Sequence, residues 1–159
     1  DVGSVRLTER FLHSDPPTAE ELAAAAESVR SSLPPPPETD HTIGVAGTIT
    51  TLAALDLGLD GPEGLGTDGH RLTLHAVRIQ RERLASLPLE ERRRLPGLHP
   101  ERAPVIVAGA VLVEQILQRF DVDALEVSER DILHGAALEA ANLPAPAEGA
   151  APPGAYTCC

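Results

Sequence analysis

The stretch Thr42–Leu55, TIGVAGTITTLAAL, joins two segments with different residue patterns through a turn of small residues. His41–Val45 is a short apolar run, which predicts a strand. Ile49–Leu57 is rich in alanine and leucine, which predicts a helix. Ala46–Thr48 lies between them as the turn. The stretch therefore predicts a strand–turn–helix unit, the building block of an α/β fold.

Two interpretations of this turn follow from its glycines. It is either a tight turn and nothing more, or a site where an anion approaches the backbone. A helix N-terminus presents free N–H groups, and the helix dipole adds attraction for negative charge. In the second interpretation Gly44, Ala46 and Gly47 form a phosphate-binding turn, and Thr48 donates its hydroxyl. The turn lacks the lysine of a Walker loop and the spacing of a dinucleotide fingerprint, so both interpretations stay open.

The segments before this turn are expected to be mainly helical. Ser4–Leu7 is interpreted as the end of a strand that continues into a short helix over Thr8–His13. Thr18 begins a longer helix, because Glu21 follows three residues later and can complete a capping box. This helix ends before Pro34–Pro37, a proline run that serves as a rigid connector or, in the alternative, as a ligand for a proline-binding module.

After the turn, helices are expected to alternate with a strand. We expect a glycine-rich loop over Gly58–Gly69, two helices over Thr73–Ser86 and Leu87–Leu95, and a long buried helix in Gly97–Phe120. A strand over Ala124–Val127 and a last helix over Asp131–Asn142 follow. Ser128 is expected to cap the last helix. Gly109, in the middle of the long helix, predicts close contact with another element. Strands that alternate with helices predict a layered α/β fold.

Composition limits the function classes. Apolar residues make up 42% of the chain but aromatic residues only 2%, so the core is expected to pack through aliphatic side chains. A formal net charge of -11 repels polyanions on average, which argues against nucleic-acid binding. A phosphate site must therefore be built locally, from backbone amides and a few placed arginines. The longest apolar run, Ala103–Val113, is too short to span a bilayer, so no membrane association is expected.

The two cysteines, Cys158 and Cys159, are adjacent in a tail rich in proline, alanine and glycine. They are either a metal or redox pair or two free thiols at a disordered end, and the second interpretation is favoured because no histidine or carboxylate lies near them. Without a disulfide framework, a reducing cytoplasm is the expected location. The histidines show no metal-ligand spacing, so no metal site is assigned.

The chain has no lysine, so its strongly basic residues are all arginines. Arg102, at the start of the long apolar helix, can pair with a carboxylate or offer a planar fork for bidentate contact with phosphate. Both roles stay open. The arginines at 78, 81, 83 and 92–94 are interleaved with glutamates at 82, 90 and 91, which favours a solvated, ion-paired face over a polyanion channel.

Four segments, taken together and in order, resemble the second domain of the exopolyphosphatase and guanosine pentaphosphate phosphohydrolase (Ppx/GppA) family. They are DVGSVRLTERFL (1–12), TIGVAGTITTLAAL (42–55), LPGLHPERAPVIVAGAVLVEQIL (95–117) and LEVSERDILHGAALE (125–139). The resemblance implies a layered, ribonuclease H-like α/β lobe of the actin-like ATPase and sugar kinase superfamily. It covers residues 1–142, with the first strands missing at the N-terminus, and leaves 143–159 as a disordered tail.

The resemblance also implies roles for particular residues. The segment Gly44–Thr48 matches the family's phosphate-binding loop, and Arg102 matches an arginine that contacts the phosphate chain. Gly3–Val5 matches a turn near the end of the third strand. The family's lysine after that turn has no counterpart, and Arg30 is a rough substitute. The family's catalytic glutamate is expected in a missing first lobe, and the metal-holding turn that opens the second lobe is also expected before Asp1. No catalytic residue and no metal ligand is therefore assigned to this chain.

The implied reaction is release of terminal phosphate from inorganic polyphosphate, with Mg²⁺ as cofactor. The runner-up is hydrolysis of guanosine pentaphosphate, and a rival from another class is a non-catalytic module that binds polyphosphate or a nucleotide. The expected partners are the phosphorylated substrate, the missing lobe and, as an open option, a second copy in a homodimer. The fragment alone is expected to be inactive, because it would supply the cradle and the clamp but not the base.

Overall fold

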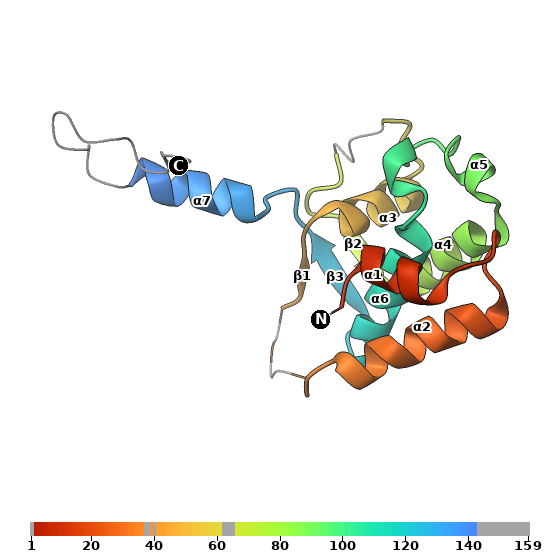
Figure 1. Cartoon of the computed structure of the whole chain (residues 1–159). Helices are drawn as coiled ribbons and strands as arrows, with labels where there is room; N and C mark the ends of the chain where they lie inside the picture. Colours follow the sequence, from red (N-terminus) through yellow and green to blue (C-terminus); the bar gives the residue numbers. More distant parts are fainter. Residues whose placement is uncertain (1, 37–38, 40, 62–65, 143–159) are drawn as a thin grey trace, which may run out of the picture. The chain divides into compact units, whose positions relative to one another are not determined.

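Three short strands pair into a mixed sheet in the part of the chain that the computed structural model describes, which is residues 2–36, 39, 41–61 and 66–142 (Figure 1). The order is β1-β3-β2. Strand β1 (Ile43–Gly44) pairs in parallel with β3 (Ala124–Val127), and β2 (Arg71–Thr73) pairs antiparallel with the other side of β3. The last of these strands in the sequence is therefore the central one, and the mixed α/β architecture expected from the sequence is confirmed.

Helices make up most of the remaining described chain. In order they are α1 (Ser4–Phe11), α2 (Ala19–Ser32), α3 (Gly47–Leu57), α4 (Leu74–Ser86), α5 (Leu89–Arg92), the 3₁₀ turn η1 (Pro100–Arg102), α6 (Ile106–Arg119) and α7 (Ile132–Ala141). Two compact units divide them, Asp1–Glu129 and Arg130–Cys159, so that α7 is in the second unit and every other helix is in the first.

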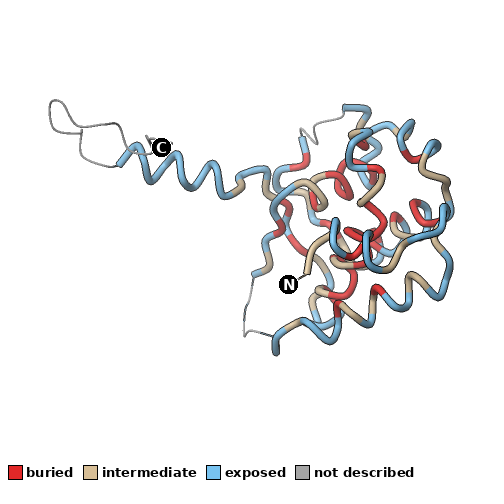
Figure 2. Tube along the Cα trace, viewed as in Figure 1, coloured by how far each residue is buried: buried red, intermediate tan, exposed pale blue. Residues whose placement is uncertain are grey.

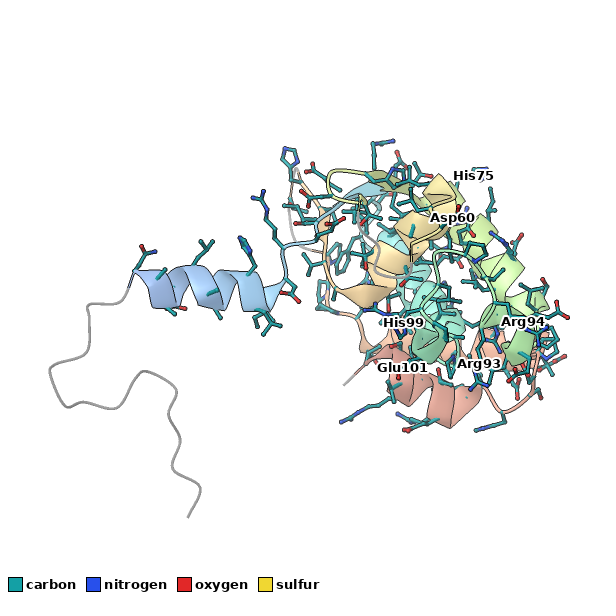
Figure 3. The ribbon with its side chains drawn as sticks, turned by 90° about the horizontal axis from the view of Figure 1, so that it is seen from above. Asp60, His75, Arg93, Arg94, His99 and Glu101 are labelled. Atoms are coloured by element: carbon teal, nitrogen blue, oxygen red, sulfur yellow. The ribbon has the colours of Figure 1, made fainter. Side chains whose placement is uncertain are left out.

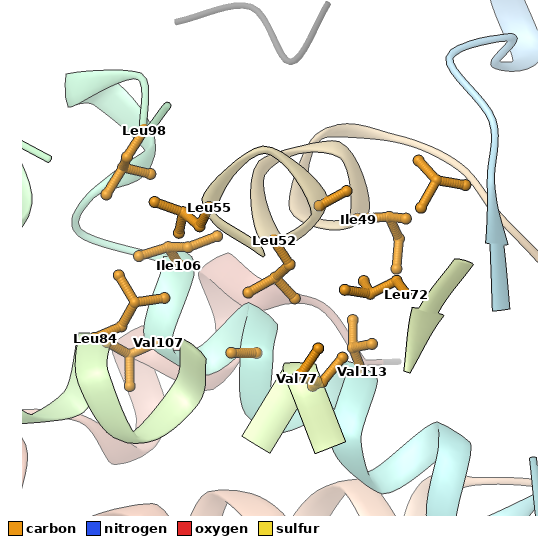
Figure 4. Close-up of a cluster of buried hydrophobic side chains, with 14 of the residues drawn as sticks. Ile49, Leu52, Leu55, Leu72, Val77, Leu84, Leu98, Ile106, Val107 and Val113 are labelled. Carbon is orange, nitrogen blue, oxygen red and sulfur yellow. The ribbon is translucent and has the colours of Figure 1, made fainter. Parts of the chain in front are cut away.

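Helix α6 is the central element of the core in the first unit, because nearly every residue from 106 to 117 is buried (Figure 2). Leu52 of α3, Leu72 of β2 and Leu84 of α4 belong to the same buried cluster as Ile106 (Figure 4). The members of this cluster are aliphatic, as the composition predicts. Each fully buried leucine or isoleucine contributes about 2 kcal/mol of transfer free energy. Helix α6 therefore holds α3, and the turn that begins it, in a fixed place.

The secondary structure predicted for Ser4–Leu7 is wrong. Ser4–Leu7 is not the end of a strand but the first half of α1, and Gly3 is its N-cap in an extended conformation. Gly3–Val5, matched to a turn of the family, therefore lies at the N-terminus of a helix. Leu7 packs with Val29 of α2 and Ala108 of α6, and burial of this apolar helical face decides the conformation.

The second helix is confirmed. Helix α2 begins after Thr18, and the capping box of Thr18 and Glu21 is present. Strand Ala124–Val127 and the long buried helix are confirmed as well, although α6 itself begins only at Ile106. Before it, Pro100–Arg102 forms a separate turn of 3₁₀ helix.

Three local predictions are corrected. Arg71–Thr73 is a strand that periodicity missed, because its pairing partner β3 is more than fifty residues away. Thr73 is the N-cap of α4 and not its first residue. The cap of α7 is Asp131, whose carboxylate accepts from the Leu133 and His134 amides, and not Ser128.

The second helix of the pair after β2 is shorter than expected, since α5 covers Leu89–Arg92 only. No helix of the described chain is long and apolar enough to cross a membrane. The expected disordered tail, 143–159, lies outside the described residues, as do positions 62–65 of the glycine-rich loop.

Candidate functional site

The turn between β1 and α3 has an unusual backbone conformation. Ala46, the N-cap of α3, has φ 72° and ψ 171°. This combination is nearly restricted to glycine, and a residue with a Cβ held there costs on the order of 1–3 kcal/mol. Such strain persists only where the surrounding structure imposes it. Ala46 follows β1 almost directly and is followed by the first residue of α3, Gly47, so that the strand and the helix together fix it.

The N-terminus of α3 is not capped by a side chain. The Thr50 amide donates to the Ala46 carbonyl at 3.2 Å and closes the first turn of the helix. The N–H groups that precede Thr50 have no acceptor within the helix, which is true of the first turn of any α-helix. These donors and the positive end of the helix dipole occupy the same place, so the turn is suited to hold an anion.

Arg102 lies directly over this turn. A Cβ built on Gly47 would overlap the guanidinium of Arg102, so only glycine leaves room for the arginine there. The arginine comes from η1, where the Arg102 amide donates to the His99 carbonyl at 2.9 Å and the Glu101 amide donates to Nδ1 of His99 at 3.3 Å (Figure 3). Among the described residues, the Arg102 guanidinium makes no ion pair and no side-chain hydrogen bond. The carboxylate partner considered for Arg102 is thus not found in the described chain.

A cavity of about 500 Å³ joins these groups. Its lining includes Ala46, Gly47, Thr48, Arg102 and Ser4, the first residue of α1. The rest of the lining is apolar and comes mainly from α3 and α6, with Ile49, Ile106, Leu112, Val113 and Ile116. The structure thus brings together four of the five residues that the sequence assigned to the site, and adds Ser4, which the resemblance placed in a turn but not in the site.

Gly44 is the exception. It is buried in β1, opposite Val127, and does not line the cavity. A Cβ on Gly44 would lie 2.7 Å from Cδ1 of Leu125 and 2.9 Å from Cγ2 of Ile49. Packing of β3 and α3 against β1 therefore already requires glycine at this position.

Thr48 is positioned by α6. A Cβ on Gly109 would lie 2.7 Å from Cγ2 and 3.0 Å from Oγ1 of Thr48, so the backbones of α3 and α6 approach closely at these two residues. The close contact predicted from Gly109 is confirmed. Helix α6 thus packs against the first turn of α3 at Thr48, and a residue larger than glycine at position 109 would displace this turn.

The described residues contain no cluster of three histidine, cysteine or acidic side chains that could hold a metal ion. The residues that line the cavity include no carboxylate. Arg30, the rough substitute for the family's lysine, does not line the cavity and instead contacts Glu27 and Gln115. What this chain brings to the site is therefore a set of hydrogen-bond donors and one cation.

Comparisons with known proteins find relatives of this chain. A model of the Ppx/GppA phosphatase family matches residues 1–142. Exopolyphosphatase 2 of Mycobacterium tuberculosis is 40% identical over 152 residues, which cover 89% of this chain and 48% of the relative. Exopolyphosphatase 1 of Mycobacterium leprae is 27% identical over 158 residues, covering 94% of this chain and 45% of the relative.

Solved structures give the same result for the fold. A Ppx/GppA enzyme of Aquifex aeolicus superposes with a TM-score of 0.79 at 33% identity, covering 87% of this chain and 47% of that one. An exopolyphosphatase-like protein superposes with a TM-score of 0.82 at 31% identity, covering 87% and 48%. The chain therefore spans about half the length of the relatives that it matches.

Proposed function

The chain belongs to the Ppx/GppA phosphatase family, and from this premise we propose that it supplies the phosphate-binding loop and the arginine clamp of an exopolyphosphatase-type hydrolase. The reaction is release of orthophosphate from the end of an inorganic polyphosphate chain. The relatives named above support polyphosphate as the substrate, since both are exopolyphosphatases by name.

The observation that carries the proposal is the place of the Arg102 guanidinium. It lies against Gly47, at the positive end of α3, and no carboxylate of the described chain pairs with it. A cation at a helix N-terminus is electrostatically unfavourable, by an amount on the order of 0.3–1 kcal/mol at an exposed site. An anion between the arginine and the helix end converts this repulsion into two attractions, which is a reason for the arrangement that folding alone does not provide.

The chemistry of the two groups is complementary. The backbone amides of the turn are fixed donors that approach phosphoryl oxygens from one side, and the guanidinium fork approaches from the other. Hydrolysis of a phosphoanhydride spreads negative charge over the transferred group, so donors that are already oriented lower the barrier. In this proposal Gly47 and Thr48 hold the phosphoryl group and Arg102 orients it.

The remaining functions are assigned to residues beyond this chain. The cavity has no carboxylate that could activate water, so the general base is proposed to come from the other half of the whole enzyme. The cavity residues by themselves do not fit a Mg²⁺ site either, because they offer no acidic ligand. Mg²⁺ remains an implication of family membership, and no step is derived through it.

The test combines binding and stability. Arg102→Ala is expected to weaken binding of tripolyphosphate by about 10- to 100-fold, the range of charge-assisted hydrogen bonds, and to leave the melting temperature nearly unchanged. Arg102→Lys should recover only part of the affinity, because it keeps the charge and loses the fork. Arg94→Ala, at an exposed arginine outside the cavity, is the matched control. A large drop in melting temperature with unchanged affinity per folded molecule would refute the clamp.

Activity assays separate the rival functions. The 159-residue chain alone should release no phosphate from long-chain polyphosphate above a protein-free blank, whereas the whole enzyme should. Release by the chain alone would place the base within it. Preference of the whole enzyme for guanosine pentaphosphate would select the runner-up reaction. Binding without hydrolysis of either substrate by the whole protein would select the non-catalytic module.

A further inference from the structure

A second cavity lies between α2 and the C-terminal part of α6. It measures about 260 Å³ and is lined by Arg30, Gln115, Gln118 and Arg119. Arg119 is the last residue of α6, and Arg102 precedes its first residue, so about 20 Å of helix separates these two arginines. Helices α2 and α6 run side by side in this region (Figure 1).

The guanidinium of Arg30 is held in place, but its contacts do not use all of its N–H donors. Its Nε and Nη2 donate to Oε2 of Glu27 at 3.1 and 2.7 Å, and its Nη1 donates to Oε1 of Gln115 at 2.8 Å. A guanidinium carries five N–H donors, and these contacts use three of them. The two N–H groups that remain belong to a side chain whose orientation is already fixed by Glu27 and Gln115.

Gln115, which lines this cavity, has an amide nitrogen without an acceptor among the described residues. The residue is only 5% exposed. An arginine can only donate, so the atom of Gln115 that faces Arg30 must be the oxygen, and the NH₂ group faces away. No described residue accepts from this NH₂ group, and it is not among the side-chain atoms that are sealed from solvent. The two N–H groups of this largely buried amide are therefore donors that an acceptor bound beside Gln115 could use.

Arg119 adds an uncompensated charge. Its guanidinium makes no ion pair among the described residues. The buried carboxylate of the described chain, Glu114, is already occupied: Nε of Arg81 lies 2.6 Å from it, Nε of Arg78 lies 3.2 Å from it, and Gln118 donates to it at 3.1 Å. The cavity therefore keeps positive charge, although the chain as a whole is strongly acidic.

We propose that this cavity is a second oxyanion site, which takes one phosphoryl group between Arg30, Gln115 and Arg119. Donors from three side chains on two helices suit a tetrahedral oxyanion better than a planar carboxylate, because three or more acceptor oxygens can be used at once. The source of the group is free inorganic phosphate or one unit of a polyphosphate chain. The site is independent of the phosphate-binding loop and does not rest on the function proposed above.

The experiment is a titration of the ¹⁵N-labelled chain with inorganic phosphate and, separately, with tripolyphosphate, at constant ionic strength. The side-chain amide signal of Gln115 reports on this cavity, and the backbone amide of Gly47 reports on the other. We expect the Gln115 signal to shift and saturate in the native chain and equally in Arg102→Ala. In Arg119→Gln the affinity read from this signal should fall at least about tenfold, as for loss of a charge-assisted contact.

A second variant guards against misfolding. Gln115→Glu keeps the contact with Arg30 and the shape of the side chain, but replaces the free donors by a negative charge, so it should abolish the phosphate-dependent shift of the Arg119 Nε–H signal. Arg94→Gln removes a charge elsewhere and should change nothing. A response to both probes indicates a general phosphate site, and a response to tripolyphosphate alone indicates a polyphosphate subsite. No saturating shift with either probe, or an unchanged affinity in Arg119→Gln, would overturn the proposal.

Discussion

The N-termini of α2 and α3 solve the same physical problem in opposite ways. Each leaves backbone N–H groups without partners in the helix. At the N-terminus of α2, side chains of the helix itself supply the missing acceptors. Oγ1 of Thr18 accepts from the Glu21 amide at 3.2 Å, and Oε2 of Glu21 accepts from the Thr18 amide at 2.9 Å. Oε1 of Glu21 also accepts from the amides of His13 and Ser14, both at 3.0 Å.

In α3 no side chain caps the helix, Ala46 has a backbone conformation that disfavours its own Cβ, and the nearest charged group is a cation. The first helix end is closed by acceptors and a negative charge, whereas the second keeps its donors and adds Arg102 to them. A helix end that serves only folding is completed by its own sequence. One that is left incomplete, at a cost in strain and repulsion, has its donors available for a ligand.

The largest effect is expected from a substitution that fills the space at the N-terminus of α3, where Arg102 lies against Gly47. Gly47→Val places a side chain where the Arg102 guanidinium now lies. The atoms displaced are the far end of a flexible side chain, so the fold should survive, but turnover of the whole enzyme should fall by at least about 100-fold, the size of the loss of an oxyanion donor. Steady-state release of phosphate from polyphosphate measures it.

Gly135→Val is the matched control for this change, because a Cβ at Gly135 meets nothing within 4 Å. It should leave turnover unchanged. A Gly47→Val enzyme that is folded and nearly as active as the native one would reduce the turn at α3 to a structural connection.

A smaller effect is expected at α2. Thr18→Ala removes the side-chain acceptor for the Glu21 amide and should lower the free energy of unfolding by about 1 kcal/mol. Thr18→Ser keeps the acceptor and should be close to neutral. Chemical denaturation measures both, and binding of tripolyphosphate should be the same in all three proteins. A change in binding for Thr18→Ala would show that the two helix ends are coupled.

The smallest effect is a pH dependence. The Thr18 amide, with further hydrogen bonds from His13 and Ser14, lowers the pKa of Glu21 below its ordinary value, against a smaller opposing effect of burial. A lowered pKa means that the carboxylate stabilises the fold at pH values above the ordinary glutamate pKa and loses this contribution as the pH falls through the lowered one. Glu21→Gln should therefore flatten the acid side of the stability curve slightly. Melting temperatures between neutral pH and about pH 3 test this, and identical slopes in both proteins would contradict it.

Sequence patterns alone located those features whose causes are local. The capping box of α2 depends on residues three positions apart, and the strand Ala124–Val127 and the buried helix α6 depend on continuous apolar runs. The glycine turn before α3 was recognisable from the strand and the helix beside it. The resemblance to a known family rested on the same short segments, which is why it could be drawn before the fold was known.

Tertiary structure decided what depends on distant partners. Arg71–Thr73 is a strand because β3 pairs with it, and Ser4–Phe11 is a helix because its apolar face meets α2 and α6. Gly44 and Gly47 look alike in the sequence, yet Leu125 and Ile49 pack where the Cβ of Gly44 would be, and the Arg102 guanidinium lies where that of Gly47 would be. Such differences arise from contacts between residues far apart in the chain, and these contacts exist only after the core around α6 has formed.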